Sequence, residues 1–263
     1  MQPVATHQPV RPIEMVDVAV GALQPPGGLV VEHVNWSVDA GDFWVIGGLQ
    51  GAGKSDFLFT TGGLMPPLEG SYRMFGETMP IFEESRLRTR LRLGLVFDSG
   101  QLLSRLTASE NVALPLMYHR NLSLAQAQPL VQNLLAALDL VPWGESLPGG
   151  LGWNWQKRVG LARALSLQPE ILLIDDPLAG LDLRHGNWWL GFLEQLSKGH
   201  PLMDGRPMTL VVTTSDLRPW QGLARQFAIL QAQRLTLLGS WEAVETGKAE
   251  SVRELMTMKP SRD

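Results

Sequence analysis

Short runs of apolar, aromatic and β-branched residues recur along the chain and predict buried strands. Residues 42–46 form one such run, Asp-Phe-Trp-Val-Ile, and residues 93–97 form another, Leu-Gly-Leu-Val-Phe. The segment 171–176 is apolar until it ends in two carboxylates, and 210–214 is a fourth run of the same kind. These four runs predict the inner strands of an α/β domain.

Two longer segments near the N-terminus alternate apolar and polar residues well enough for strands. They cover residues 13–20 and 29–38, and the Pro- and Gly-rich residues 24–28 form a turn between them. We expect the two strands to make an antiparallel edge beside the first buried run. A short strand is expected at 71–75, and a last antiparallel pair begins at 227–230.

Helical periodicity dominates the middle of the chain, from residue 107 to residue 140. The pattern predicts a break at Pro115, because proline lacks the N–H that a helix interior needs. A second break is expected around residues 121–123, where the Ser123 hydroxyl can cap the next helix. The segment therefore predicts a set of short helices.

Two further segments are assigned by composition. Residues 81–92 are charged and rich in arginine, which most simply indicates a solvated helix face. Residues 145–155 are rich in glycine and predict a loop. The apolar positions of residues 156–165 then predict a helix that follows this loop.

The composition favours a globular protein. The chain has 263 residues, 44% of them hydrophobic, and a net charge of −4, so it can bury a full core as one large α/β domain or as two lobes. The sequence contains no apolar run of about 18 residues and no basic-then-apolar signal pattern at its start. We therefore expect a cytoplasmic location.

Composition also narrows the chemistry. The absence of cysteine excludes disulfides, thiolate metal sites and cysteine nucleophiles, and the five histidines show no ligand spacing. The mild acidity and the lack of a Lys/Arg run argue against nucleic acid as a partner.

The residues 48–55, Gly-Leu-Gln-Gly-Ala-Gly-Lys-Ser, match the P-loop pattern in its expected setting, after a buried strand and before a helix. Such a loop aims backbone N–H groups at phosphates, its lysine reaches the terminal phosphates, and its serine can hold Mg²⁺. A glycine-rich turn that binds nothing is the less favoured alternative. The predicted nucleotide-binding residues are Gly48, Gln50, Gly51, Ala52, Gly53, Lys54, Ser55 and Asp56.

Two carboxylates, Asp175 and Asp176, end the apolar strand that starts at residue 171. This is where the magnesium-binding aspartate of a P-loop enzyme belongs. We therefore expect ATP with Mg²⁺, and we assign Ser55 and Asp175 to the metal.

The order of these motifs resembles that of the ATP-binding cassette (ABC) ATPases over roughly residues 13–258. Besides the P-loop, family-like sequence motifs are found at residues 107–116 and 158–165. The motif Ile-Asp-Asp-Pro at 174–177 is followed by Gly-Leu-Asp at 180–182. The resemblance is nearest to ATP-binding subunits of bacterial importers or lipid-transport systems. It implies the α/β P-loop NTPase fold of that family, with an antiparallel β edge and an inserted helical subdomain.

The resemblance also implies partners and boundaries. Members of the family form a head-to-tail dimer of cassettes, with ATP between them, and drive an integral membrane permease from the inner face of the cell membrane. The helical subdomain would span about residues 98–165, and residues 1–12 and 259–263 would be flexible tails. In that subdomain Leu102, Leu103, Leu106 and Leu116 could contact the permease or fill its own core.

Three positions depart from the family pattern at the catalytic centre. Asp98 stands where the family has glutamine, and it can still serve as a Mg²⁺ ligand although its reach is shorter. Asp176 replaces the catalytic glutamate and Ser215 replaces the switch histidine. Because a general base must lie within about 3 Å of its proton, the shorter Asp176 predicts impaired hydrolysis.

Other departures affect nucleotide contacts. Without a gap, the family's Leu-Ser-Gly-Gly-Gln signature falls on residues 151–155, Leu-Gly-Trp-Asn-Trp; a gapped register would use 147–151, and the signature serine is missing in both. Trp153 and Trp155 would block close approach to phosphate and are expected to pack at an interface. No adenine-stacking aromatic is found at residues 20–22, and Asp56 is either close to the phosphates or simply a helix-start residue.

Two functions remain open from the sequence. The chain is either the ATP-binding subunit of an ABC transporter with slow hydrolysis, or a non-hydrolysing module that serves as the degenerate half of a cassette pair or as a regulatory subunit. Both require ATP binding at Lys54 and Ser55.

Overall fold

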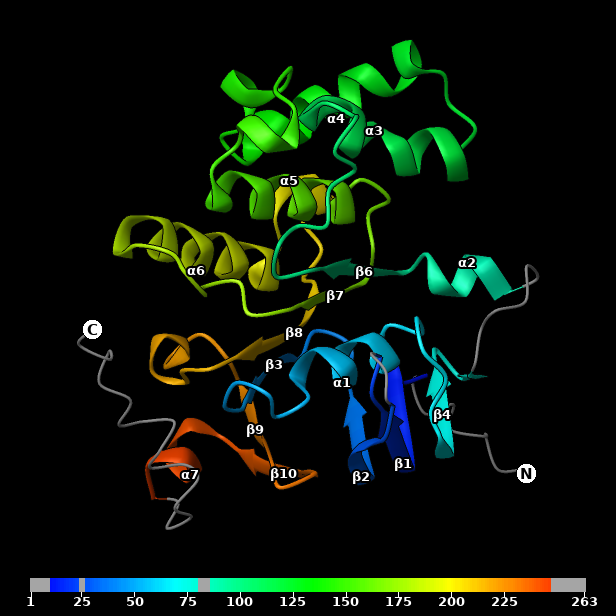
Figure 1. The fold of residues 1–263 in the computed structure, drawn as a ribbon, viewed down its shortest axis with the longest axis vertical. Coiled ribbons are helices and arrows are strands. Elements are labelled where there is room, and N and C mark those ends of the chain that lie inside the picture. The colour runs from blue at the N-terminus through cyan, green and yellow to red at the C-terminus, as the bar shows by residue number, and fades with distance from the viewer. Residues whose placement is uncertain (1–9, 24–26, 80–85, 247–263) are drawn as a thin grey trace, which may run out of the picture.

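Ten strands form one sheet in the computed structural model, whose described residues are 10–23, 27–79 and 86–246. The order across the sheet is β5-β4-β1-β2-β10-β9-β3-β8-β7-β6 (Figure 1). The strands are β1 Ile13–Gly21, β2 Leu29–Val38, β3 Phe43–Gly47, β4 Glu69–Met74, β5 Glu77–Thr78, β6 Leu93–Val96, β7 Ile171–Ile174, β8 Thr209–Thr214, β9 Gln226–Gln231 and β10 Arg234–Gly239. This mixed sheet with helices confirms the predicted α/β class.

The inner strands β6, β7, β8, β3 and β9 run parallel to one another. All residues of β3, β7 and β8 are buried, as expected for parallel strands covered on both faces. Because successive side chains point to opposite faces, Phe43 and Val45 enter one core while Trp44 and Ile46 enter the other. The sheet therefore separates two hydrophobic cores.

The first core lies between the antiparallel strands and helix α1, Lys54–Thr61. Phe57 and Leu58 are the buried apolar residues of this short helix. The ring of Trp36 lies 5.8 Å from that of Trp44 and 5.3 Å from that of Phe57, measured between centroids. This aromatic contact joins α1 to both parts of the sheet, so the start of α1 has a fixed place.

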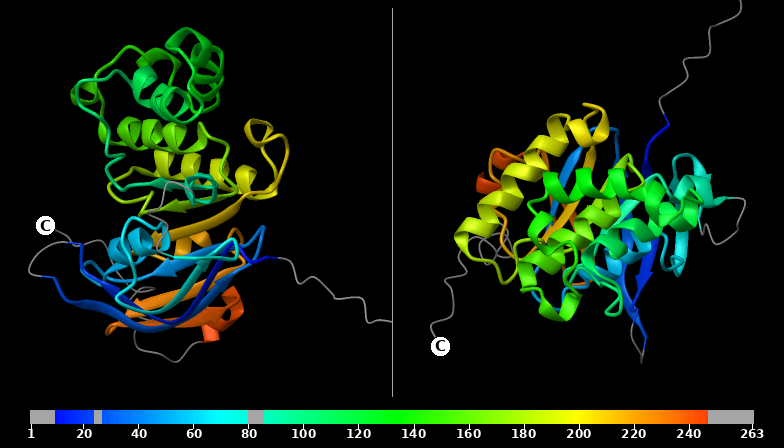
Figure 2. Two further views of the ribbon diagram at one scale, coloured as in Figure 1. Left: turned by 90° about the vertical axis from the view of Figure 1, so that its right-hand side faces the viewer. Right: turned by 90° about the horizontal axis from the view of Figure 1, so that it is seen from above.

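The second core lies on the opposite face of the parallel strands, beneath a stack of helices (Figures 1 and 2). The larger helices are α3 Ala108–His119, α4 Leu124–Ala137, α5 Trp153–Leu165 and α6 Leu183–Lys198. Capping boxes begin α3 at Thr107 and α4 at Ser123, which confirms the predicted Ser123 cap. The shorter helical segments are α2 Leu87–Arg90, α7 Trp241–Thr246, and the 3₁₀ turns Val141–Trp143, Pro148–Gly150, Pro201–Met203 and Arg218–Trp220.

Helices α3, α4 and α5 lie between β6 and β7 in the sequence and rise above the sheet in Figure 1. Close to the N-terminus, Arg11 pairs with Asp39 at 3.0 Å and the Pro12 carbonyl accepts a bond from the Phe75 N–H. Of the predicted tails, 1–12 and 259–263, the structure describes only residues 10–12. Residues 247–258 of the predicted domain also lie outside the described residues. Within the described part of the chain no helix is long and apolar enough to cross a membrane.

One prediction about the strands needs correction. The antiparallel strands β1 and β2 do not adjoin the P-loop strand β3, because the hairpin of β9 and β10 lies between β2 and β3. Sequence order gave no sign of this insertion, since the hairpin comes from the other end of the chain. The predicted pair beginning at residue 227 is confirmed as the antiparallel pair of β9 and β10.

Two predictions about helix limits are also wrong. Pro115 does not break α3, because Val112 and Leu116 on either side of it are fully buried and hold the helix together. The helix predicted at 156–165 begins instead at Trp153, with Gly152 in an extended conformation before it, so residues 153–155 are not a loop. Of the arginine-rich residues 81–92, α2 covers only Leu87–Arg90, and 81–85 lie outside the described residues.

Candidate functional site

The loop between β3 and α1 needs glycine for two separate reasons. Gly51 and Gly53 have φ angles of 81° and 87°, which L-amino acids with side chains rarely adopt. A Cβ at Gly53 would also lie 2.0 Å from Cγ1 of Val30, and one at Gly48 would lie 2.9 Å from the Leu230 carbonyl oxygen. The backbone is therefore held in one tight conformation.

This conformation leaves backbone donors available at the start of α1. Among the described residues, the N–H groups of Gly51, Gly53, Lys54 and Ser55 have no acceptor. They add to the positive end of the helix dipole, and such a cluster suits phosphate oxygens. The loop thus has the geometry of an anion site.

Lys54 lies beside these donors. Its ammonium donates to the Gly48 carbonyl at 2.6 Å and to the Leu49 carbonyl at 3.1 Å. Burial lowers the pKa of Lys54, while the nearby Asp176 and Asp175 oppose that change. The ammonium is therefore kept at the loop, where it can meet a negatively charged ligand.

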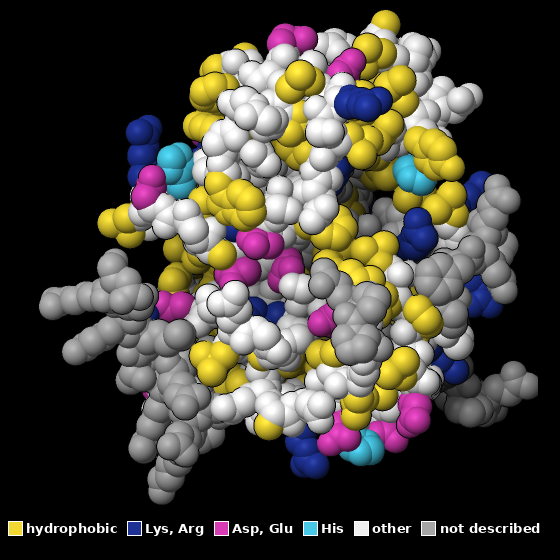
Figure 3. Space-filling model, in the orientation of Figure 1, with side chains coloured by type: hydrophobic (Ala, Val, Ile, Leu, Met, Phe, Trp, Pro, Cys, Tyr) yellow, Lys and Arg dark blue, Asp and Glu magenta, His cyan; other side chains and the backbone are white. Residues whose placement is uncertain are grey.

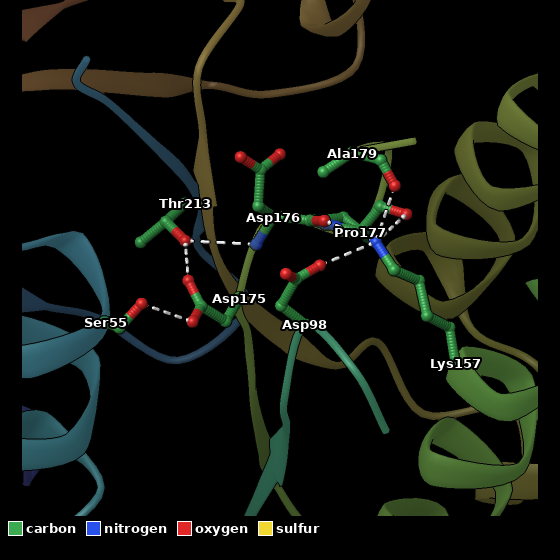
Figure 4. Close-up of polar contacts among 8 residues, drawn as sticks. All are labelled: Ser55, Asp98, Lys157, Asp175, Asp176, Pro177, Ala179 and Thr213. Carbon is green, nitrogen blue, oxygen red and sulfur yellow. Dashed lines mark hydrogen bonds and ion pairs between the residues drawn. The ribbon is translucent and has the colours of Figure 1, made fainter. Parts of the chain in front are cut away.

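Asp175 is a carboxylate with only 6% of its surface exposed, and both of its oxygens accept hydrogen bonds. The Ser55 hydroxyl donates to Oδ2 at 2.6 Å and the Thr213 hydroxyl donates to Oδ1 at 2.7 Å (Figure 4). The Thr213 hydroxyl also accepts the Asp176 N–H at 3.2 Å. These hydrogen bonds thus connect the start of α1 to the carboxyl ends of β7 and β8.

Asp176 has a φ angle of 36°, an unusual value for a residue with a side chain. Figure 4 shows its carboxylate pointing away from that of Asp175. Burial raises the pKa of Asp176, the charges of Lys54 and Lys157 lower it, and Asp98 and Asp175 raise it further. Adjacent residues of one strand end therefore present their carboxylates in different directions.

Asp98 follows β6 and its Oδ1 lies 2.8 Å from the Lys157 ammonium of α5. Lys157 is 1% exposed and also donates to the carbonyls of Asp176 and Ala179, both at 2.9 Å (Figure 4). Asp98 itself is 46% exposed and faces the same cavity as the loop. Helix α5 is therefore connected to the site by a buried lysine.

A cavity of ≈ 610 Å³ brings most of the predicted residues together. Its lining contains four carboxylates and one ammonium, and Figure 3 shows acidic side chains gathered in the hollow at the middle of this face. The lining residues are Gln50, Gly51, Gly53, Lys54, Ser55, Asp56, Asp98, Asp175, Asp176, Ala179 and Ser215. Of the other predicted residues, Gly48 contributes its carbonyl to Lys54, and Ala52 packs against the first core.

Asp56 has a structural partner as well as a place in the cavity lining. Its Oδ1 accepts the backbone N–H of Leu23 at 2.8 Å, which ties the segment after β1 to α1. This contact explains an aspartate here without a phosphate. The sequence-based prediction that Asp56 contacts the nucleotide stays a prediction.

The residues suit a magnesium ion that is shared with phosphate. In the described ranges, no group of three or more His, Cys, Asp or Glu side chains could hold a metal by itself. Mg²⁺ is usually bound through one or two protein oxygens, substrate phosphates and water. Ser55 and Asp175, 2.6 Å apart at the phosphate-binding loop, fit that arrangement.

Sequence reasoning missed two residues of the site, Thr213 and Lys157. Thr213 is a polar residue inside the apolar run 210–214, and its position next to the carboxylates required the strand order. Lys157 shares a helix face with Leu161, four residues on, and both are buried. A lysine on an apolar face was the signal that could have revealed it.

The segment where the signature motif was sought forms a 3₁₀ turn at Pro148–Gly150 and then the start of α5. The ring centroid of Trp155 lies 5.4 Å from that of Trp143. The guanidinium carbon of Arg158 lies 4.8 Å from the ring centroid of Trp155 and 3.4 Å from that of Trp188. Trp153 is 44% exposed. A contact of Trp153 with another molecule stays a prediction.

Comparison with known proteins adds independent information. The family model described as "ABC transporter" matches residues 31–179. A methionine import ATP-binding protein of Lacticaseibacillus paracasei is 33% identical over 202 residues, covering 76% of this chain and 55% of the relative. An intermembrane phospholipid transport system ATP-binding protein of Escherichia coli is 28% identical over 228 residues, covering 86% of this chain and 82% of the relative.

Other relatives differ in length and in the transport they are named for. A macrolide export ATP-binding/permease protein of Campylobacter jejuni is 32% identical over 235 residues, and the chain spans only 34% of that protein. It likewise spans only about half the length of the methionine relative. A solved dimeric ATP-binding cassette bound to ADP and Pi has a TM-score of 0.74 and 28% identity, covering 85% of this chain and 96% of the other.

The hydroxyl of Thr213 provides a test of the hydrogen-bonded group around Asp175. Replacing Thr213 with valine keeps the volume but removes the partner of a buried carboxylate oxygen and of the Asp176 N–H. We expect a loss of about 1–3 kcal/mol in the free energy of unfolding, measured in urea. The control is Thr60→Val, because the Thr60 hydroxyl is buried without a partner in the described residues. Equal losses for both variants would contradict the role of Thr213.

Proposed function

The chain belongs to the ABC transporter family, and on this premise we propose that it is the ATP-binding subunit of a membrane transporter and hydrolyses ATP slowly at most. The observation that carries the proposal is one cavity that contains the free N–H groups of the loop, Lys54 and the Ser55–Asp175 pair. Backbone donors and a lysine at a helix start recognise phosphates rather than a particular metabolite. The transported substrate would be recognised by the membrane partner.

The charges of the cavity indicate the form in which the nucleotide binds. Four carboxylates and one ammonium line it, so a free triphosphate would meet net repulsion. We therefore propose that ATP enters with Mg²⁺, which would neutralise phosphate charge when bound. Ser55 and Asp175 would hold the metal, residues 48–54 would bind the phosphates, and Asp56 would lie beside them.

We propose that hydrolysis is impaired by the side chains around the phosphates. Asp176 takes the place of a general base, and its unusual backbone conformation is fixed from both sides, because Thr213 accepts its N–H and Lys157 donates to its carbonyl. From that backbone position its carboxylate reaches one methylene less far than a glutamate would. Ser215 faces the same cavity, but it carries no positive charge.

The helical segment offers an exposed apolar face for a membrane partner. Leu114, Met117 and Tyr118 lie three and four residues apart on α3, so they share one face, and Tyr118 is 79% exposed. Leu103, just before α3, is also exposed, whereas Leu116 is fully buried and only fills the core. We propose that this face, not Leu116, contacts the permease.

Nucleotide binding is tested at Lys54. The variant Lys54→Ala removes a partly buried ammonium and should weaken Mg-ATP binding by roughly 1.5–3 kcal/mol, which is about tenfold or more in affinity. Isothermal calorimetry with Mg²⁺ present measures this change. Lys198→Ala is the matched control, since Lys198 pairs with Glu194 on the surface of α6. Unchanged affinity in Lys54→Ala would refute the assignment of the site.

Impaired hydrolysis is tested by restoring the longer side chains. The unmodified chain should bind Mg-ATP but release phosphate far below the ~10 s⁻¹ typical of enzymes. With a partner cassette that has an intact signature loop, Asp176→Glu combined with Ser215→His should exceed the product of the two single effects, because such residues act together. Brisk turnover by the unmodified protein alone would show that Asp176 and Ser215 suffice.

The membrane partner is tested by recovery of the native complex. A permease should copurify with the chain, and Tyr118→Glu should weaken that association by about 2 kcal/mol, the scale of an aromatic interface anchor. Leu64→Glu is the control, because Leu64 is exposed at the end of α1, away from α3. Equal recovery of the permease with both variants would place the contact elsewhere.

A further inference from the structure

Lys157 is a buried cation that the proposed chemistry does not use. It lies in the second turn of α5, and its side chain is 1% exposed. A buried ammonium is costly unless hydrogen bonds and an opposite charge compensate it. Its partners should therefore show what it does.

The three protons of the ammonium match three short contacts. They are the Asp176 carbonyl at 2.9 Å, the Ala179 carbonyl at 2.9 Å and Oδ1 of Asp98 at 2.8 Å; the Pro177 carbonyl is farther, at 3.4 Å. Two of these partners belong to the turn after β7, and the third follows β6. Of the described residues, Asp98 is the one carboxylate in ion-pair distance.

Helix α5 also binds the loop after Asp98 along its length. Arg163, one and a half turns farther on, donates to the Gly100 carbonyl at 2.7 Å and to the Gln101 carbonyl at 2.8 Å. A Cβ at Gly160 would lie 2.8 Å from Cα of Gly100, so helix and loop are in direct contact. The loop at 98–101 is therefore fixed to α5. Lys157 attaches the turn at 176–179 to the same helix.

We propose that Lys157 is a positioning residue that holds Asp98 and the turn 176–179 to α5 as one unit, with Asp98 acting as its counter-ion rather than as a magnesium ligand. A metal that took the charge of Asp98 would leave the ammonium buried among neutral carbonyls. Asp175 is not the counter-ion of a buried cation, since its hydrogen-bond partners are two hydroxyls. The part of this proposal that concerns the metal rests on the proposed function, and the part that concerns the turn does not.

This attachment couples the position of α5 to the shape of the nucleotide cavity. The turn that carries the Asp176 backbone and the loop that carries Asp98 both border the nucleotide cavity, and both are attached to the same helix of the helical segment. A displacement of α5 would therefore move both edges of the cavity together.

The first experiment measures the turn without nucleotide. In Asp98→Ala, amide hydrogen exchange at Ala179 and Leu181 should become roughly tenfold faster, a fall in local stability that corresponds to 1.4 kcal/mol, although Asp98 bonds neither residue. Asp98→Asn keeps the shape and should behave like Asp98→Ala, whereas Asp98→Glu should recover part of the protection. These variants change a half-exposed residue, so the test does not require a Lys157 variant that folds.

Asp139→Ala is the matched control. Asp139 pairs with Arg158, another buried cation of α5, at 3.2 Å, and it lies away from the turn 176–179. Asp139→Ala should lower the melting temperature by about 2–4 °C for each kcal/mol of unfolding free energy lost, as expected for a chain of this size. It should not make amide exchange at Ala179 or Leu181 faster. Unchanged exchange at both amides in Asp98→Ala would overturn the positioning role of Lys157.

The second experiment measures Mg²⁺. In titrations of Mg²⁺ with ADP bound, Asp175→Asn should raise the half-saturating concentration more than about tenfold, and Asp98→Asn should change it less than about threefold. Equal losses for the two variants would overturn the counter-ion role of Asp98. If the wild type binds no Mg-nucleotide, the proposed function fails, and the exchange experiment still decides the role of Lys157.

Discussion

The site depends on the need to satisfy one buried carboxylate. Asp175 is almost fully enclosed, so each of its oxygens must have a donor. Ser55 and Thr213 supply these donors from α1 and β8, and Asp175 itself directly follows β7. The same hydroxyl of Thr213 accepts the Asp176 N–H and so fixes the next residue as well. The proposed phosphate-binding loop, the proposed metal-binding carboxylate and the candidate base are thereby held in one geometry.

A second constraint comes from the helical segment. Lys157 and Arg163 occupy one helix, and together they donate to four carbonyls and pair with one carboxylate at the edge of the cavity. A buried cation such as Lys157 is a strong restraint, because losing a partner leaves its charge without compensation. Helix α5 does not line the cavity itself but holds two segments that do, at Asp98 and at residues 176–179. The four carboxylates of this lining are the reason for the proposal that a divalent cation accompanies the nucleotide.

The sequence predicted the elements whose burial leaves a simple pattern. The runs at β3, β6, β7 and β8 were readable because strands covered on both faces are apolar throughout. The position of the β9–β10 hairpin was not readable, since strand order is a long-range property. Helix α6 received no prediction, although its buried residues Trp189, Phe192, Leu193 and Leu196 follow helical spacing; only the low helix propensity of Gly186 and Gly191 argued against it. The P-loop residues were found from their spacing, but the partners Thr213 and Lys157 became visible only once distant strands and α5 were placed.

Binding and hydrolysis place different demands on this chain. The proposed phosphate contacts would come from backbone N–H groups, which need only the glycines and the fold of the loop, and from the side chain of Lys54. Hydrolysis needs a side-chain oxygen at a defined reach, and the aspartate at 176 is one methylene shorter than a glutamate would be. The backbone of Asp176 is held at both its N–H and its carbonyl, so a shift of the backbone to make up that length would break these bonds. Under the proposed function, such a cassette would therefore lose turnover while it keeps its nucleotide.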